Sequence, residues 1–193
     1  MKERPILFSA PMIRAILENR KTQTRRIIQQ KHLDWMNNSV ENFLAGRWDQ
    51  RPMPYGKPGD WLWVREAWQA WKEFDGTSPS NIPKHALERV NYLADGNKWD
   101  ARYRHARFMP HWASRILLEI TDVRVERLQD ISEEDAIAEG LIRQGEGWRG
   151  ATELPWYASP VGAYRSLWET INGAGSWESN PYVWVTKFKR VPS

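Results

Sequence analysis

The sequence contains no cysteine among its 193 residues. This absence excludes disulfide frameworks, thiolate nucleophiles, Cys-ligated zinc and iron–sulfur clusters, and it fits a reducing compartment. Long apolar runs are also missing, since stretches such as Arg115–Ile120 fall far short of the roughly 18–20 residues that a membrane span needs. The first five residues do not open an apolar signal sequence either. We therefore expect a soluble, cytoplasmic protein with no membrane partner.

Signatures of metal and cofactor binding are scarce. The four histidines do not adopt a His-Glu-x-x-His spacing; they are His32, His85, His105 and His111. The sequence has no phosphate-binding loop and no dinucleotide fingerprint, and Gly162 does not lie in a nucleophile elbow. We expect no metal and no cofactor, so any catalysis must use other side chains.

Positive charge is concentrated in two places. Residues 1–30 hold seven Lys or Arg and two Glu, within a chain whose formal net charge is +4. A second run, residues 101–115, holds four Arg and no acidic residue, with Tyr103, Phe108 and Trp112 between them. Basic side chains interleaved with aromatic rings are typical of surfaces that bind nucleic acids or nucleotides. An ordinary solvated loop would explain the same composition equally well.

Three segments have the features of helices, at Ser9–Asn19, Ser132–Gly140 and Ser159–Gly173. Each begins with a serine that can accept a hydrogen bond from the first turn. Each ends at Asn or Gly, which tolerate the positive φ of a C-terminal cap. The apolar residues in the first and third segments recur at helical spacing, so we expect one face of each helix to be buried.

Alternating apolar residues and turn signals predict strands at Pro5–Phe8, Arg20–Ile28, Trp61–Trp68, Trp112–Leu128 and Asn180–Arg190. Thr121-Asp122 marks a bend within the fourth. Residues 69–110 lack periodicity, and we expect an insertion with one short helix near Pro83–Tyr92. Helices and strands alternate too sparsely for a doubly wound parallel sheet. The pattern favours an α+β fold, a small mixed β-barrel of about five or six strands with about three flanking helices.

The segment Arg20–Arg26 joins the end of the first helix to a strand. Lys21 and Thr24 are three positions apart, so on a regular strand their side chains would face opposite ways. A shared site therefore requires a bend or a bulge between them. An exposed basic turn explains the same residues, and Glu139 has an equally simple explanation as a solvated carboxylate on a short helix.

The segment Ile16–Arg26 resembles the signature of the ASCH domain family, a branch of the PUA-like barrels, in which Gly-Arg-Lys-Thr-x-Thr-x-Arg follows the first helix. Four further blocks resemble the family in the same order; they are Gly59–Val64, Leu118–Thr121, Ser132–Gly140 and Tyr182–Phe188. Asn19 stands where the family has Gly, a mild change because Asn also accepts positive φ. The overall style is similar to that of ASCH-like proteins carried by phages and prophages.

The resemblance implies one PUA-like domain over residues 1–193, with insertions at approximately 31–54, 69–110 and 143–158. Small bacterial members of the family release acetate from N4-acetylcytidine with a Lys, a Thr and a Glu. These roles fall by motif position on Lys21, Thr24 and Glu139, and the following family Arg falls on Arg26. Other members are RNA-binding modules, so the fold alone does not indicate an enzyme.

The resemblance further implies that Thr24 is the nucleophile and Lys21 activates it, with Glu139 orienting or relaying. A lysine has a pKa near 10.4 in water, so a neutral Lys21 requires strong desolvation. If Lys21 stays charged, it stabilises the oxyanion and Glu139 is the base. Arg25 and Arg26 could hold the pyrimidine by hydrogen bonds, and Trp63 or a neighbouring tryptophan could stack on it, although alternating Trp residues on a strand are more often core.

Two functions remain open from the sequence. The first is a metal-independent amidohydrolase that removes an acyl group from N4-acylated cytosine nucleosides or a related modified base. The second is a PUA-like module that binds RNA or single-stranded nucleic acid without catalysis, suggested by the basic start and by residues 101–115.

Overall fold

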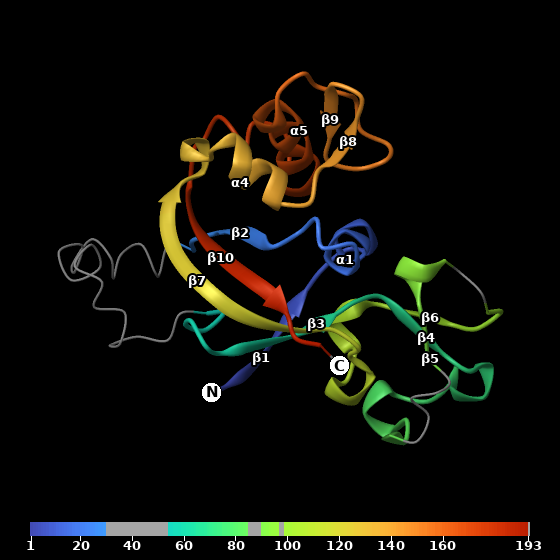
Figure 1. The fold of residues 1–193 in the computed structure, drawn as a ribbon. Coiled ribbons are helices and arrows are strands. Elements are labelled where there is room, and N and C mark those ends of the chain that lie inside the picture. Colours follow the sequence, from blue (N-terminus) through green and yellow to red (C-terminus); the bar gives the residue numbers. More distant parts are fainter. Residues whose placement is uncertain (30–53, 85–89, 97–98, 193) are drawn as a thin grey trace.

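A curved, mixed sheet of five strands forms the centre of the molecule (Figure 1). The computed structural model describes residues 1–29, 54–84, 90–96 and 99–192. In the order β1-β3-β7-β10-β2, the first two strands are parallel and all other neighbours are antiparallel. The strands are β1 (Glu3–Leu7), β2 (Gln23–Ile27), β3 (Trp61–Arg65), β7 (Leu117–Arg127) and β10 (Tyr182–Arg190). The predicted α+β class is confirmed.

Both faces of the long strands are buried. On β10, Val183 and Val185 belong to one apolar cluster, whereas Trp184 and Phe188 belong to another. This division follows from the alternation of side chains along a strand. The ladder between β7 and β10 shifts register opposite Thr121, because Lys187 pairs with Asp122 and Phe188 with Ile120. The bend predicted at Thr121-Asp122 is thus a bulge in a continuous strand.

The three predicted helices are confirmed; they are α1 (Ala10–Leu17), α4 (Glu133–Ala138) and α5 (Pro160–Asn172). Ser132 and Ser159 each accept a hydrogen bond from a backbone N–H of the first turn. Ser9 occupies the N-cap of α1, but its hydroxyl makes no capping hydrogen bond there. The predicted ends have positive φ at Asn19 (58°), Gly140 (98°) and Gly173 (96°). None of the helices in the described part of the chain is long and apolar enough to cross a membrane.

The strand predicted over Trp61–Trp68 is two strands in two sheets, because the chain leaves the central sheet after Arg65. It then enters a satellite sheet of order β5-β4-β6, composed of β4 (Trp68–Ala70), β5 (Val90–Tyr92) and β6 (Tyr103–Arg104). This sheet has its own apolar cluster around the buried Trp68. The helix predicted near Pro83–Tyr92 is wrong at Val90–Tyr92, where β5 pairs with β4, and residues 85–89 lie outside the described residues.

Several short elements complete the fold. Single turns of 3₁₀ helix are η2 (Lys72–Phe74), η3 (Pro79–Asn81), η5 (Leu93–Asp95), η6 (Ala106–Phe108), η7 (His111–Ala113) and η8 (Leu128–Asp130). The hairpin of β8 (Ile142–Gln144) and β9 (Gly147–Arg149) begins one residue before the third predicted insertion and lies against α5 (Figure 1). The first predicted insertion lies outside the described residues apart from its last position.

A partly buried group of ion pairs joins the satellite sheet to the central sheet. Arg115 Nε donates to Glu66 Oε1 at 2.9 Å, and Arg115 Nη1 donates to Asp95 Oδ2 at 2.7 Å. Glu66 is almost wholly buried, and burial raises the pKa of its carboxyl group. Removing the cation from a buried carboxylate destabilises a protein far more than removing it from an exposed carboxylate.

We therefore expect Arg115→Ala to lower the free energy of unfolding by about 3–5 kcal/mol. The matched control is Arg165→Ala, which removes an arginine whose partner Glu178 is exposed, and should cost at most about 1 kcal/mol. Urea unfolding of both variants measures the difference. Equal costs would show that the Glu66 contact does not anchor the satellite sheet.

Candidate active site

Backbone pairing brings together the two segments that carry Lys21 and Glu139. α4 ends at Ala138, and the next residue, Glu139, forms an antiparallel bridge with Lys21. Beside it, Thr22 N donates to Ala138 O at 2.9 Å, and Lys21 N donates to Ala15 O at 3.0 Å. The end of α1 and the end of α4 therefore fix the backbone of Lys21 from two sides.

The side chains of the same two residues form a buried ion pair. Lys21 Nζ donates to Glu139 Oε2 at 2.7 Å and to the Glu139 backbone oxygen at 2.9 Å. Arg25 Nη1 donates to the other carboxylate oxygen, Oε1, at 3.1 Å. Lys21 is 2% and Glu139 5% exposed. Each oxygen of this carboxylate thus has its own cationic donor, which fixes the orientation of the group.

Burial decides the ionisation of this lysine. Desolvation lowers the pKa of Lys21 below its ordinary value, although the neighbouring Glu139 carboxylate opposes the effect. Tyr164 lies beside the same carboxylate, and burial raises its pKa well above the ordinary value. The tyrosine is therefore a neutral hydroxyl in the site, and Lys21 gives up its proton more readily than a lysine in water.

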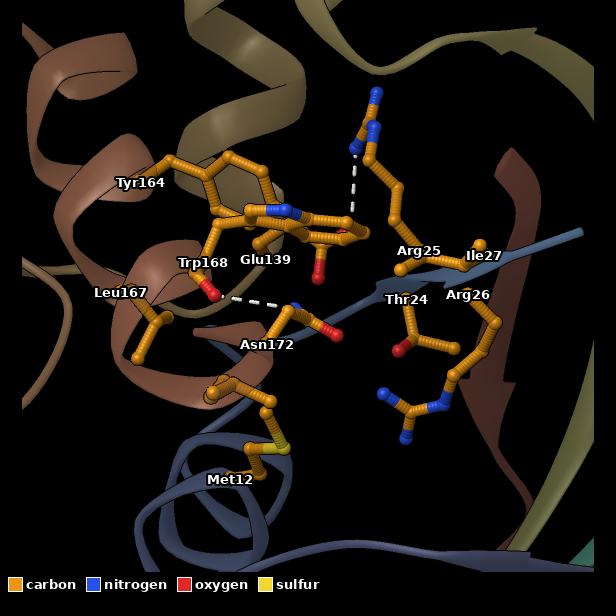
Figure 2. A pocket seen from close by; sticks show the side chains of 11 residues that line it. Met12, Thr24, Arg25, Arg26, Ile27, Glu139, Tyr164, Leu167, Trp168 and Asn172 are labelled. Atoms are coloured by element: carbon orange, nitrogen blue, oxygen red, sulfur yellow. Dashed lines mark hydrogen bonds and ion pairs between the residues drawn. The ribbon is translucent and has the colours of Figure 1, made fainter. Parts of the chain in front are cut away.

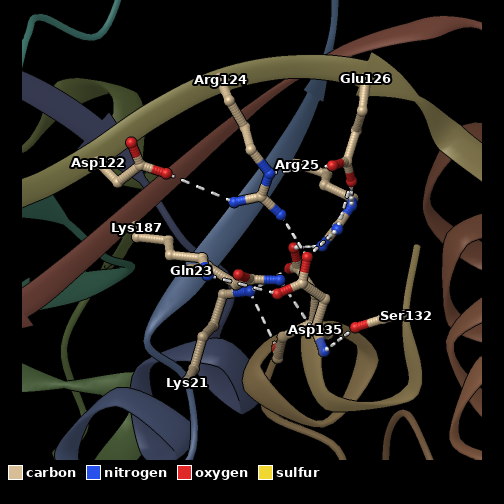
Figure 3. Close-up of polar contacts among 10 residues, drawn as sticks. Lys21, Gln23, Arg25, Asp122, Arg124, Glu126, Ser132, Asp135 and Lys187 are labelled. Atoms are coloured by element: carbon tan, nitrogen blue, oxygen red, sulfur yellow. Dashed lines mark hydrogen bonds and ion pairs between the residues drawn. The ribbon is translucent and has the colours of Figure 1, made fainter. Parts of the chain in front are cut away.

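Arg25 connects the ion pair to a wider charge network (Figure 3). Its guanidinium donates to Glu126 at 2.5 Å and to Asp135 at 2.9 Å, in addition to Glu139. Arg124 bonds both Glu126 and Asp135 from the other side. Three carboxylates from β7, α4 and the end of α4 thus hold Arg25 in place, and Arg25 in turn holds Glu139.

A cavity of about 90 Å³ lies beside this pair, between β2 and α5 (Figure 2). β2 is an edge strand of the central sheet, so consecutive residues from both of its faces reach the cavity. The cavity is lined by Met12, Thr24, Arg25, Arg26, Ile27, Glu139, Tyr164, Leu167, Trp168, Ile171 and Asn172. Thr24 and Glu139 therefore share one cavity, whereas Lys21 lies behind Glu139 and does not line it.

The other predicted binding residues have different positions. Arg26 lines the cavity and donates to Leu7 O at 3.0 Å, and it forms no ion pair with a carboxylate in the described part of the chain. Arg25 also lines the cavity, but its bonds to three carboxylates commit it to positioning rather than to binding a pyrimidine. Trp63 lies on β3, packed against Arg65 and His111, and does not line this cavity. A stacking role for Trp63 in this cavity does not fit its place in the fold.

Two aromatic residues of α5 line the site, although their spacing in the sequence predicts only core residues. Tyr164 and Trp168 are one helical turn apart, and both line the cavity beside Glu139. Trp168 Nε1 is buried without a hydrogen-bond partner in the described part of the chain. The i, i+4 spacing correctly predicts one buried face of α5. The same spacing does not indicate that this face of α5 covers a cavity as well as the sheet.

Acidic residues are numerous here, but among the described residues no group of three His, Asp or Glu side chains is arranged to hold a metal ion. Arg25 and Arg124 lie among the carboxylates of Glu126 and Asp135. The network therefore holds guanidinium groups in the position that a cation would occupy.

Comparison with known proteins gives one structural match. No model of a known protein family matches the chain, and no curated protein sequence matches it. The structure is similar to the crystal structure of an ASCH domain from Lactobacillus crispatus JV V101, with a TM-score of 0.40 and 12% sequence identity. The match covers 98% of this chain and 79% of that chain. The matched protein is described as an ASCH domain, the family whose motifs this sequence resembles.

Gly140 allows α4 and Lys21 to approach each other. Its φ is +98°, and a Cβ there would lie 2.9 Å from both Ala15 Cβ and Lys21 Cβ. We expect Gly140→Ala to lower the free energy of unfolding by about 1–2 kcal/mol for the backbone conformation, plus about 1–3 kcal/mol for overpacking.

Gly173→Ala is the matched control, because Gly173 has nearly the same φ, +96°, and no atom within 4 Å of its added Cβ. It should lose only the conformational part, and thermal or urea unfolding separates the two. If both variants lost equal stability, the contact at Lys21 would not constrain the site.

Proposed function

We propose that the chain is a metal-independent amidohydrolase that removes the acyl group from N4-acylated cytosine nucleosides or a related modified base. The observation that carries the proposal is the buried Lys21–Glu139 pair, whose Glu139 lines the same cavity as Thr24. The three residues occupy the positions that the ASCH motifs assign to catalysis. The cavity supplies a hydroxyl, a carboxylate and a guanidinium, the groups that acyl transfer uses.

Thr24 is the proposed nucleophile. Its oxygen attacks the carbonyl carbon of the acylated N4 amide, and its proton passes to Glu139. When the tetrahedral intermediate collapses, the bond between the carbonyl carbon and N4 breaks, and N4 leaves as an amine after taking a proton. Water then attacks the acyl ester of Thr24 and releases the carboxylic acid, and the threonine hydroxyl is restored.

The proton path favours a relay over direct action by Lys21. Glu139 faces the cavity, whereas Lys21 lies behind it at 2.7 Å. A neutral lysine has two hydrogens, which match its two acceptors on Glu139. The carboxylate therefore passes the proton from Thr24 to Lys21 and later returns it to the leaving amine. Arg25 keeps the carboxylate in position throughout.

Arg26 is the proposed stabiliser of the oxyanion. Lys21 and Arg25 are both occupied by Glu139, whereas Arg26 lines the cavity without an ion pair among the described residues. Its guanidinium is therefore the positive charge that remains for the developing negative charge on the carbonyl oxygen.

The size of the cavity suggests which part of the substrate enters. Small-molecule sites commonly have volumes of about 300–1,000 Å³, and this cavity has about 90 Å³. It therefore suits the acyl amide end of a substrate rather than a whole nucleoside. The ribose and whatever is attached to it would lie outside.

The first test is hydrolysis of N4-acetylcytidine by the purified chain in the presence of a chelator, followed by chromatography of cytidine. We expect turnover, and we expect Thr24→Val to reduce it to the background rate because the variant lacks the hydroxyl. Thr186→Val is the matched control. Thr186 lies on β10, where it pairs with Thr24 of β2 and is equally buried, but it does not line the cavity. It should retain most of the activity. Absence of cytidine with active controls, or equal losses in both variants, would contradict the proposal.

The second test is the dependence of the rate on pH. A relay that ends on Lys21 needs the neutral amine, whose fraction increases as the pH rises through the lowered pKa. We expect kcat to rise with pH to a plateau whose midpoint lies below 10.5, the ordinary lysine value. Lys21→Arg keeps the positive charge but cannot become neutral in this range, so we expect a loss of about 10²–10⁴-fold. A rate that rises only at the acidic pH of a carboxylate, with Lys21→Arg active, would assign the base to Glu139 and leave Lys21 charged.

A further inference from the structure

The satellite sheet has a groove of its own, apart from the candidate active site. Its volume is about 600 Å³, and one wall is β6, which is an edge strand of the sheet. The opposite wall is the loop between η2 and η3. The groove is lined by Gly76, Thr77, Ser78, Pro79, Arg102, Tyr103, Arg104, His105 and Phe108, a set that contains no carboxylate.

The two arginines of this groove have no ion pair. The backbone N–H of Arg102 donates to the Asp75 carboxylate at 2.7 Å, and its guanidinium donates to the Asp75 backbone oxygen at 3.4 Å. Arg104 is only 6% exposed; it donates to Phe74 O at 2.6 Å, and its guanidinium lies over the ring of the buried Trp68. Within the described ranges, no carboxylate lies within ion-pair distance of either guanidinium. Burial lowers the pKa of Arg104, and the charge of Arg102 lowers it further, whereas the Asp75 carboxylate opposes both effects.

Two aromatic rings in the groove are exposed to solvent. Tyr103 is 47% and Phe108 59% exposed, and both belong to the groove lining. Packing does not explain them, because the apolar cluster of the satellite sheet contains neither residue. Exposed rings beside the exposed Arg102 guanidinium offer flat stacking surfaces and a phosphate-binding group within one groove.

We propose that this groove binds single-stranded nucleic acid, with bases stacked on Tyr103 and Phe108 and phosphates held by the exposed Arg102. A single strand exposes the faces of its bases, which rings of this kind can cover. A duplex hides those faces, and an acidic peptide does not pair each negative charge with an aromatic ring as a nucleotide does. The proposal is independent of the amidohydrolase activity, because none of the groove residues lines the catalytic cavity.

The direct test is binding of a fluorescein-labelled oligouridylate to the full chain, measured by anisotropy at several KCl concentrations. We expect binding that weakens as salt increases, because phosphate contacts release counterions. We also expect an RNA duplex of the same length to bind more weakly at each salt concentration. Failure to bind at low salt, binding independent of salt, or a preference for the duplex would overturn the proposal.

Variants of Phe108 separate stacking from structure. Phe108→Ala should weaken binding by about 5- to 150-fold, the usual effect of losing one base-stacking ring, whereas Phe108→Trp should bind at least as tightly as the parent. Tyr182→Ala is the matched control, because it removes another exposed ring that lies beside an arginine but outside the groove. It should leave affinity unchanged. Equal affinity of Phe108→Ala and the parent, with both folded by circular dichroism, would exclude stacking in this groove.

Variants of the cations test the phosphate contacts. Arg102→Ala should reduce the slope of log affinity against log salt by about 0.7, the value for one phosphate of a single strand. Lys189→Ala is the control, because Lys189 is exposed, pairs with Glu119 and lies outside the groove. It should leave the slope unchanged. An unchanged slope in Arg102→Ala would show that the groove does not hold the phosphates.

Discussion

The contact between the Lys21 amine and the Glu139 carboxylate constrains the arrangement around the candidate site. Both groups are almost wholly removed from water, and neither is stable there without a partner, because an uncompensated buried charge is costly. Lys21 therefore ties the start of β2 to the end of α4, and Arg25 secures the second carboxylate oxygen from the same strand. The pairing also determines reactivity, since burial lowers the pKa of the lysine while the carboxylate next to it keeps an acceptor at the edge of the cavity.

The location of this contact at a sheet edge explains how one short strand can serve both structure and chemistry. Within a sheet, neighbouring residues point to opposite faces and cannot share a site. β2 has β10 on one side only, and Thr24, Arg25 and Arg26 all line the cavity beside this edge strand. Helix α5 closes that edge with Tyr164 and Trp168. The same residues thereby shield the edge from pairing with another strand.

Local signals in the sequence predict much of the fold, and distant contacts account for what they miss. Helix ends follow from single residues such as Ser132 and Gly140, and the bulge opposite Thr121 follows from an interruption in alternation. Where the strand predicted at Trp61–Trp68 divides, Glu66 bonds Arg115, a partner that periodicity cannot identify. Lys21 and Glu139 are 118 positions apart, so only the family resemblance could suggest their meeting. The cavity-facing side of α5 gives the same apolar pattern as a face that packs only on a sheet.

The cavity of the candidate active site and the groove of the satellite sheet differ in whether their positive side chains form ion pairs. This difference indicates which ligand each can bind. At the candidate active site Lys21 and Arg25 are both bonded to Glu139, so the attraction of this cavity for a phosphate is small. One guanidinium, that of Arg26, remains for a charge that develops during reaction. In the satellite groove, by contrast, the exposed Arg102 guanidinium has no ion pair within the described ranges, and the rings of Tyr103 and Phe108 are exposed. A neutral acylated base therefore suits the first, and an anionic strand suits the second. If both proposals hold, the satellite sheet would retain a polymer while the small cavity acts on a single modified base.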